Sequence, residues 1–245
     1  MALALKKMYQ GYFWVINDLA DPRTDDYFLM SSPIPVIIIV GLWLKFIFHW
    51  GPAYMKDRPP YDLKYIMIFY NVFQIFANGF ITYLAWTARK EVDWECTPVD
   101  YSSSYWGQLF LWSSHKYFML KIADLLDTIF FVLRKKDRHI SFLHTYHHFG
   151  MVLITWIGAR YVGGGHSYFI AYNSKYGKLE WLKKLITQAQ LVQFIFILYM
   201  FVKLFFTKGC EYPKIVPFFI VPQNLFMIIL FGDFYVRIIF LDNGV

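Results

Sequence analysis

The stretch KIADLLDTIFFVLRKKDRHISFLHTYHH, residues 121–148, determines how the rest of the chain is interpreted. Its first half places Lys121, Asp124 and Asp127 inside an apolar segment, a basic turn follows, and its second half contains three histidines within five positions. A charged side chain at membrane depth costs at least about 2.5 kcal/mol on insertion scales, so it usually faces a partner or a cavity. This stretch is therefore the first candidate for a functional site.

The composition of the chain is that of a membrane protein. The 245 residues are 58% hydrophobic and 22% aromatic, whereas globular chains are about 45–50% apolar. No polar linker or low-complexity tract interrupts residues 1–245, so one integral-membrane domain is expected. The net charge of +7 comes from basic residues in short loops, which favours membrane topology and an anionic substrate over nucleic acid. The two cysteines, Cys96 and Cys210, could form one disulfide but define no framework.

The apolar segments predict an all-α fold, a multi-pass bundle of transmembrane helices. Residues 1–33 are a lead-in, whose first part is interrupted by Lys6, Lys7 and Gln10 and is expected to lie in the membrane interface as an amphipathic segment. About 20 apolar residues cross the bilayer as a helix. The expected spans lie near residues 34–50, 65–86, 117–133, 142–158, 187–206 and 218–240.

Positive charge predicts the sidedness of the loops. Loops 51–64 and 134–141 carry three and four basic residues and should be cytoplasmic, and the acidic loop 87–112 should lie on the far side. Segment 159–184 should lie there too, yet its apolar part is too short to cross the membrane and it contains Arg160, Lys175, Lys178, Lys183 and Lys184. Either this basic loop is misplaced for its topology, or a span that would be expected here is absent.

Two polar patterns on expected spans have a structural and a functional interpretation each. Lys121, Asp124 and Thr128 follow one another at i, i+3 and i+7, which a packed Lys–Asp pair or a site would equally produce. Asn71, Gln74 and Asn78 share one helical face, and hydrogen bonds between helices are favoured there over contact with a substrate.

The histidines at 144, 147 and 148 share one face of a helix. They could bond neighbouring helices, or belong to the kind of histidine box that holds two iron ions in membrane desaturases and hydroxylases. The chain has only seven histidines and the other four are scattered, so ligands for a metal are too few. Neutral imidazole can also accept an acyl group and release it, with a second histidine moving the proton. This third interpretation is favoured.

At these residues the chain resembles the very-long-chain fatty acid elongase (ELO) family, the membrane condensing enzymes. The family motif KxxExxDT corresponds to residues 121–128, FFVLRKK to 130–136, HxxHH to 144–148, TxxQxxQ to 187–193 and YNxxQ to 70–74. The resemblance implies seven spans around an acyl tunnel in the endoplasmic reticulum membrane. It also implies a very-long-chain 3-oxoacyl-CoA synthase, an acyltransferase that joins fatty acyl-CoA and malonyl-CoA to give 3-ketoacyl-CoA, CO2 and CoA.

The resemblance also implies roles for particular residues. His144, His147 and His148 would be catalytic, with His147 as the acyl acceptor, and no metal or cofactor is expected besides the two CoA substrates. The expected partners are the lipid bilayer, a second copy of the chain and other enzymes of the elongation cycle. The substrate-binding residues would be Lys121, Asp124, Asp127, Arg134, Lys135, Lys136, Gln190 and Gln193.

The chain departs from the family in three places. Asp124 stands where the family has Glu, the lysine-rich tail after Val245 is missing, and the motif HxxMYxYY is missing after His166. The last departure coincides with the span that charge counting finds absent, so about six spans are expected, with the last two reversed unless a remnant re-enters. An alternative function follows: a catalytically impaired family member that acts through subunit contacts. A di-iron desaturase or hydroxylase is the more distant alternative.

Overall fold

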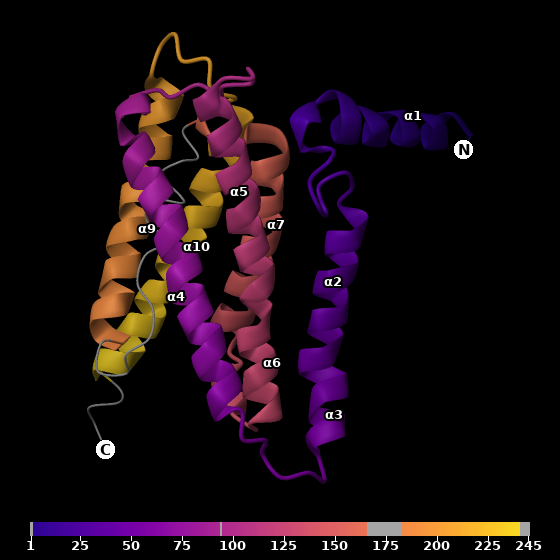
Figure 1. The fold of residues 1–245 in the computed structure, drawn as a ribbon, viewed down its shortest axis with the longest axis vertical. Helices are drawn as coiled ribbons and strands as arrows, with labels where there is room; N and C mark the ends of the chain where they lie inside the picture. Colours follow the sequence, from indigo (N-terminus) through magenta and orange to yellow (C-terminus); the bar gives the residue numbers. More distant parts are fainter. Residues whose placement is uncertain (1, 94, 166–182, 241–245) are drawn as a thin grey trace. The chain divides into compact units, whose positions relative to one another are not determined.

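The computed structural model describes residues 2–93, 95–165 and 183–240. Within these ranges every regular element is a helix, which confirms the expected all-α fold (Figure 1). Internal contacts divide the chain into two compact units: the first comprises residues 1–74 and 101–164, and the second comprises residues 75–100 and 165–245. One domain over the whole chain stays a prediction.

The first span of the first unit is longer than the sequence indicates. Helix α2 (Ile34–Lys45), a π-helical turn (Phe46–Trp50) and α3 (Gly51–Met55) form a continuous helical stretch. The expected end near residue 50 is wrong because Pro52 occupies the first turn of α3, where no backbone donor is needed. A Cβ atom at Gly51 would lie 2.6 Å from Cγ1 of Val132, so glycine permits the close packing here.

The next span of this unit is divided into two helices, α5 (Tyr105–Ala123) and α6 (Leu125–Leu133). The sequence predicted a loop up to residue 112, but Ser104 caps α5 by accepting a hydrogen bond from the Gly107 amide at 2.9 Å. His115 and its polar neighbours made the start of this helix look like a loop in the sequence. His115 is buried, and its Nε2 lies 3.0 Å from the Phe28 carbonyl oxygen.

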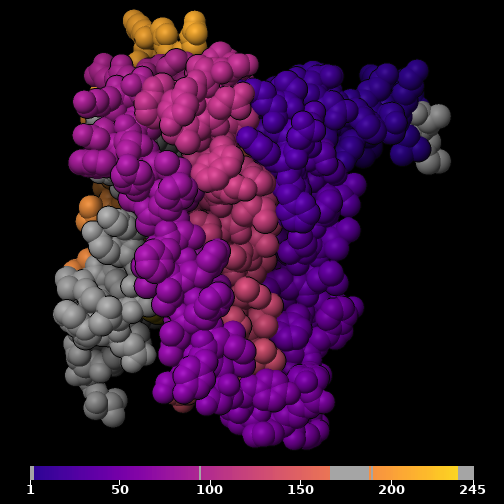
Figure 2. Space-filling view, in the orientation of Figure 1, coloured from indigo at the N-terminus to yellow at the C-terminus, as the bar shows by residue number. Residues whose placement is uncertain are grey.

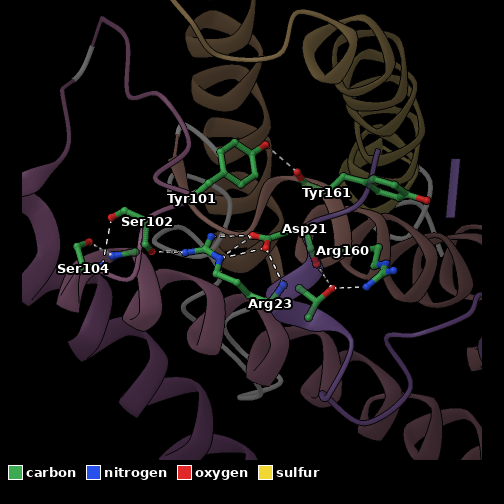
Figure 3. Close-up of polar contacts among 9 residues, drawn as sticks. Asp21, Arg23, Tyr101, Ser102, Ser104, Arg160 and Tyr161 are labelled. Carbon is green, nitrogen blue, oxygen red and sulfur yellow. Dashed lines mark hydrogen bonds and ion pairs between the residues drawn. The ribbon is translucent and has the colours of Figure 1, made fainter. Parts of the chain in front are cut away.

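Helix α7 (Phe142–Val162) extends four residues beyond the expected end and includes Arg160. The sequence placed Arg160 in a basic loop, which is wrong: its side chain is 1% exposed. The guanidinium donates to Thr24 Oγ1 at 2.5 Å, to Asp25 Oδ1 at 2.6 Å and to the Ile16 carbonyl oxygen at 2.7 Å. Arg160 thus binds the lead-in to the end of α7 and counts as a structural residue (Figure 3).

One side of α2 packs against α5, α6 and α7 in the core of the first unit, and its other side is exposed and apolar. Trp43 donates to the Leu125 carbonyl oxygen at 2.9 Å, and Trp156 donates to that of Leu29 at 2.8 Å. Ile37 and Ile38 on the outer side are 57% and 53% exposed, as expected for a helix that faces lipid. The core includes Val36, Val40, Trp43, Ile47, Phe118, Leu125, Val132, Val152 and Trp156.

The second unit contains the latter part of α4 (Lys64–Thr87), α9 (Lys183–Phe206) and α10 (Ile215–Phe240). Helices are present where the last two spans were expected, and they begin three to four residues earlier than predicted. Asn224 of α10 donates to the Phe194 carbonyl oxygen of α9 at 2.6 Å.

Three stretches of the described residues are long and apolar enough to cross a membrane: Ile34–Met55, Lys64–Glu91 and Ile215–Val236. A shorter apolar helix covers Gln190–Phe206. The protein is therefore a multi-pass helical membrane protein, and the expected number of about six spans stays a prediction.

A disulfide in the second unit joins Cys96, after α4, to Cys210, between α9 and α10. Lys203 and Glu95 form an ion pair at 2.9 Å beside it. Because the bond holds both loops on one side of the membrane, α10 returns toward the side from which α4 starts. The sequence predicted that the last two helices cross in the reversed direction unless a remnant of the missing span re-enters the membrane. A reversal would place Cys210 on the side opposite Cys96, which the disulfide does not allow. The missing motif and His166 fall in residues 166–182, outside the described residues.

Replacing Arg160 should destabilise the first unit. Arg160→Met removes three hydrogen bonds to a charged group, each worth about 1.5–3 kcal/mol, so we expect the apparent melting temperature in detergent to fall by at least about 5 °C. The exposed Arg138→Met is the matched control, and it should melt like the unmodified protein. Equal melting of the two variants would contradict the structural role of Arg160.

The disulfide predicts the accessibility of a thiol. In Cys96→Ser the Cys210 thiol is free, and in sealed vesicles with the cytoplasmic face outside we expect an impermeant maleimide to label it only after permeabilisation. In the unmodified protein, labelling should require reduction of the disulfide as well as permeabilisation, since both thiols are paired. Labelling of Cys210 in intact vesicles would show that this loop is on the cytoplasmic side.

Candidate functional site

The histidine box lies in the first two turns of α7. Ser141 caps this helix, and its Oγ accepts a hydrogen bond from the His144 amide at 3.2 Å. The cap starts α7 immediately after the basic turn, so the side chains of His144, His147 and His148 project together from its beginning. All three are half-buried.

The three imidazole rings form a contiguous cluster. The ring centroids of His144 and His148 are 4.2 Å apart, and those of His147 and His148 are 5.6 Å apart with the rings nearly perpendicular. Thr128 Oγ1 of α6 lies 2.9 Å from Nε2 of His144, which fixes the orientation of that ring. Electrostatic interactions also link His147 to Lys121 and Asp124. The structure therefore brings the box together with the polar residues of α5 and α6.

A chain of polar contacts surrounds the carboxylate of Asp124. Lys121 Nζ lies 2.9 Å from Oδ2, and Gln74 Nε2 of α4 donates to Oδ1 at 2.7 Å. The same Gln74 nitrogen lies 2.9 Å from the Tyr70 hydroxyl, which donates to the Ala123 carbonyl oxygen at 3.3 Å. Each carboxylate oxygen thus has its own donor, as a charge shielded from water requires.

Tyr70 and Gln74 were not among the predicted site residues. The sequence does contain a pattern that points to Gln74, because Gln74 shares a polar helical face with Asn71 and Asn78. We interpreted this pattern as hydrogen bonds between helices and not as contact with a substrate. That interpretation is confirmed for Gln74, and its partner is a predicted site residue.

Asp124 lies at the junction between α5 and α6, so the polar stripe is not on one continuous helix as predicted. The Asp124 amide still donates to the Leu120 carbonyl oxygen at 2.9 Å, and the Asp127 amide donates to the Asp124 carbonyl oxygen at 3.2 Å. At this junction the short aspartate reaches both Lys121 and Gln74. Asp127 is half-buried in the first turn of α6.

The basic turn connects α6 to α7, and its side chains differ in how far they are exposed. Arg134 is half-buried with its Nη1 3.1 Å from Sδ of Met67, whereas Lys135 and Lys136 are exposed. Lys135 has a φ of 52° and its Nζ donates to the Lys56 carbonyl oxygen at 3.3 Å. Cationic side chains are thus present at the C-terminal end of α6, the helix that begins next to Asp124.

The remaining predicted residues, Gln190 and Gln193, belong to α9 in the second unit, where both are half-buried. Their role in the site stays a prediction. Among the residues that the structure describes, no group of three or more His, Cys, Asp or Glu side chains is arranged to hold a metal ion. The di-iron alternative gains no support from these side chains.

Comparison with known proteins gives a consistent result. A family model described as "ELO: GNS1/SUR4 family" matches residues 28–239. Very long chain fatty acid elongase 7 of the rat is 33% identical, over 89% of this chain and 85% of the rat protein. Very long chain fatty acid elongase 4 of human is 32% identical, over 97% of this chain and 81% of the human protein.

The lengths of these matches show that this chain is shorter than its relatives inside the aligned region. The human match extends over 258 positions, while 97% of 245 residues is about 238, so about 20 positions have no counterpart in this chain. A segment of this length would cross about 30 Å as a helix. The total number of unmatched positions is therefore similar to the length of one span.

The contact between Gln74 and Asp124 can be tested by a double-mutant cycle. Gln74→Leu removes a hydrogen bond to a charged carboxylate, so we expect it to destabilise the protein by about 1.5–3 kcal/mol, measured by equilibrium unfolding in mixed micelles. In an Asp124→Ala background the same change should cost less, with a coupling of about 0.5–3 kcal/mol. Strictly additive effects would mean that the two side chains do not interact.

Proposed function

This chain belongs to the ELO family, the GNS1/SUR4 family that includes the very long chain fatty acid elongases, and from this premise we propose that it catalyses the condensing step of fatty acid elongation. It would be a 3-oxoacyl-CoA synthase that joins fatty acyl-CoA and malonyl-CoA. The observation that carries the proposal is the contiguous imidazole cluster at the start of α7, oriented by the contact between Thr128 and His144.

In the first step an imidazole nitrogen of His147 attacks the thioester carbonyl of fatty acyl-CoA. The carbon–sulfur bond breaks, the proton lost by His147 reaches the CoA sulfur, and an acyl-imidazole and CoA result. A neighbouring imidazole, His148 or His144, moves this proton; such positioned groups contribute about 10²–10⁴-fold to a rate. Thr128 keeps His144 in one orientation, which prepares the cluster for the transfer.

In the second step malonyl-CoA loses CO2, and the electron pair of the broken carbon–carbon bond attacks the acyl carbon. The bond from this carbon to His147 breaks, 3-ketoacyl-CoA forms, and the imidazole takes up one proton. Acyl-imidazole suits this step because imidazole leaves readily. We assign Lys121, held by Asp124, to stabilising negative charge that develops on the reacting oxygens.

The substrates divide into an anionic part and an apolar part. Arg134, Lys135 and Lys136 would hold the CoA phosphates by charge-assisted hydrogen bonds. The acyl chain would enter apolar space between the helices, where each buried methylene contributes about 0.8 kcal/mol, so tunnel length would set the preferred chain length. Asp127, Gln190 and Gln193 are proposed as further substrate contacts.

The disulfide supports a place for this reaction in the cell. Cys96 and Cys210 are paired, and disulfides persist in oxidising compartments such as the lumen of the endoplasmic reticulum. We therefore place the protein in that membrane, with the basic turn on the cytoplasmic face. Other enzymes of the elongation cycle, which would reduce the keto product, are its proposed partners.

A second candidate function rests on the shorter length of this chain. About 20 positions of the human relative have no counterpart here, and the HxxMYxYY motif is missing from the sequence. A chain that lacks these groups would be catalytically impaired and would act through contacts with other elongation enzymes or with another copy.

An elongation assay separates the two candidates. In microsomes from cells without their own elongases, we expect the chain to incorporate label from malonyl-CoA, and His147→Ala to reduce the rate by at least about 10²-fold because the acyl acceptor is lost. The exposed His49→Ala is the matched control and should retain the unmodified rate. Labelled acyl groups should be recovered on His147.

Two results would overturn the condensing proposal. One is an active His147→Ala variant. The other is an inactive unmodified chain beside an active human elongase 4 in the same microsomes, which would establish the impaired candidate instead.

A further inference from the structure

We propose that α1 (Ala2–Phe13) is a lipid-binding arm, which lies in the interface of the membrane leaflet on the disulfide side. Its occupant is the bilayer itself, at the boundary between headgroups and acyl chains. The inference concerns the lead-in only and is independent of the condensing reaction.

The two faces of α1 differ in chemistry. At about 100° per residue, Lys6, Lys7 and Gln10 share one face with a single apolar residue, Leu3. Leu5, Met8 and Tyr12 follow one another at i, i+3 and i+7 on the opposite face. In the structure the apolar face is uncovered: Leu5 is 61% exposed, Met8 72% and Tyr12 40%. An apolar face of this kind requires a partner that is apolar on one side and wet on the other, which is the property of a membrane interface.

The direction of α1 fits this partner. Within the first unit, α1 lies transverse to α2 at the end where α2 begins, and it extends away from that helix (Figures 1 and 2). Since α2 belongs to a stretch that is apolar and long enough to cross the bilayer, a helix transverse to it at its end lies along the membrane plane. The exposed apolar side of α2 starts at Ile34, which is 55% exposed, and would meet lipid at the same level.

A polar network around the buried Asp21 connects the lead-in to α7 and to the segment before α5. The Asp21 amide donates to the Arg160 carbonyl oxygen at 3.0 Å, and the Asp21 carboxylate holds Arg23 at 2.7 Å. Arg23 in turn donates to the Ser102 carbonyl oxygen at 2.5 Å (Figure 3). Burial and the neighbouring Asp21 raise the pKa of the Tyr101 phenol, which stays protonated and donates to the Tyr161 carbonyl oxygen at 3.1 Å. These bonds hold the segment that connects α1 to α2 against α7 and the residues before α5.

The same network identifies the leaflet. Tyr101 and Ser102 follow Cys96 closely in the chain, and its disulfide requires an oxidising compartment. Because Arg23 contacts Ser102, the lead-in lies on that side of the membrane, opposite the basic turn. Lys6 and Lys7 would extend from α1 to the headgroup phosphates while the stems of their side chains cover apolar surface.

The test uses two single-cysteine variants of the full chain, Met8→Cys on the apolar face and Lys7→Cys beside it on the polar face. The native cysteines are paired, so each variant offers one reactive thiol for an environment-sensitive fluorophore. In phosphatidylcholine nanodiscs that contain lipids with a quencher on the acyl chain, we expect quenching of the Met8→Cys label to exceed that of the Lys7→Cys label by at least about twofold. Aqueous iodide should show the opposite preference.

Several outcomes would overturn the proposal. Equal quenching of the two labels would show that α1 does not lie in the interface with its apolar face inward. Protection of the Met8→Cys label that depends on two copies per nanodisc would make a second copy the occupant. Reaction of the Lys7→Cys thiol with an impermeant reagent in sealed vesicles, cytoplasmic face outside, would refute the leaflet. Both variants should melt like the unmodified protein, because Lys7 and Met8 are exposed, and a variant that does not is replaced by Lys6→Cys or Tyr9→Cys.

Discussion

The carboxylate of Asp124 bonds to two donors from different helices, and the rest of the first unit depends on this arrangement. Lys121 and Gln74 approach its two oxygens at 2.9 and 2.7 Å. An ammonium and a carboxylate away from water are tolerated only when paired and hydrogen-bonded. The Gln74–Asp124 bond joins α4 to the junction between α5 and α6. One turn further along α6, Thr128 contacts His144 of α7.

The elements of the fold that are apolar throughout could be predicted from sequence, and those stabilised by distant partners could not. The spans near residues 34–50, 65–86 and 218–240 are evident from composition alone. The start of α5 was missed because His115 and its polar neighbours suggest a loop, and the carbonyl that satisfies His115 belongs to Phe28, which is remote in sequence. Arg160 was misassigned for the same reason, since its partners at Ile16, Thr24 and Asp25 lie far upstream.

The histidine cluster followed from the spacing of His144, His147 and His148, because helical geometry alone places residues three and four apart on one face. The geometry around Asp124 did not. No glycine or proline marks the junction between α5 and α6, so the sequence predicted one stripe where the structure has two helices. Gln74 was recognised as a residue that bonds between helices, but its partner could be identified only once α4 and α5 were placed together.

The disulfide gives the shortened chain a topology that its loops do not predict. Charge counting and the missing motif would reverse α9 and α10, yet Cys210 must stay on the side of Cys96. A covalent bond outweighs a bias of a few lysines, each of which contributes about 1 kcal/mol near a charged membrane surface. The order in which α4, α9 and α10 cross therefore depends on a bond between two loops, while the geometry of the histidines depends on polar contacts within the first unit. Changes in the length of the connection after α7 can thus alter one feature without altering the other.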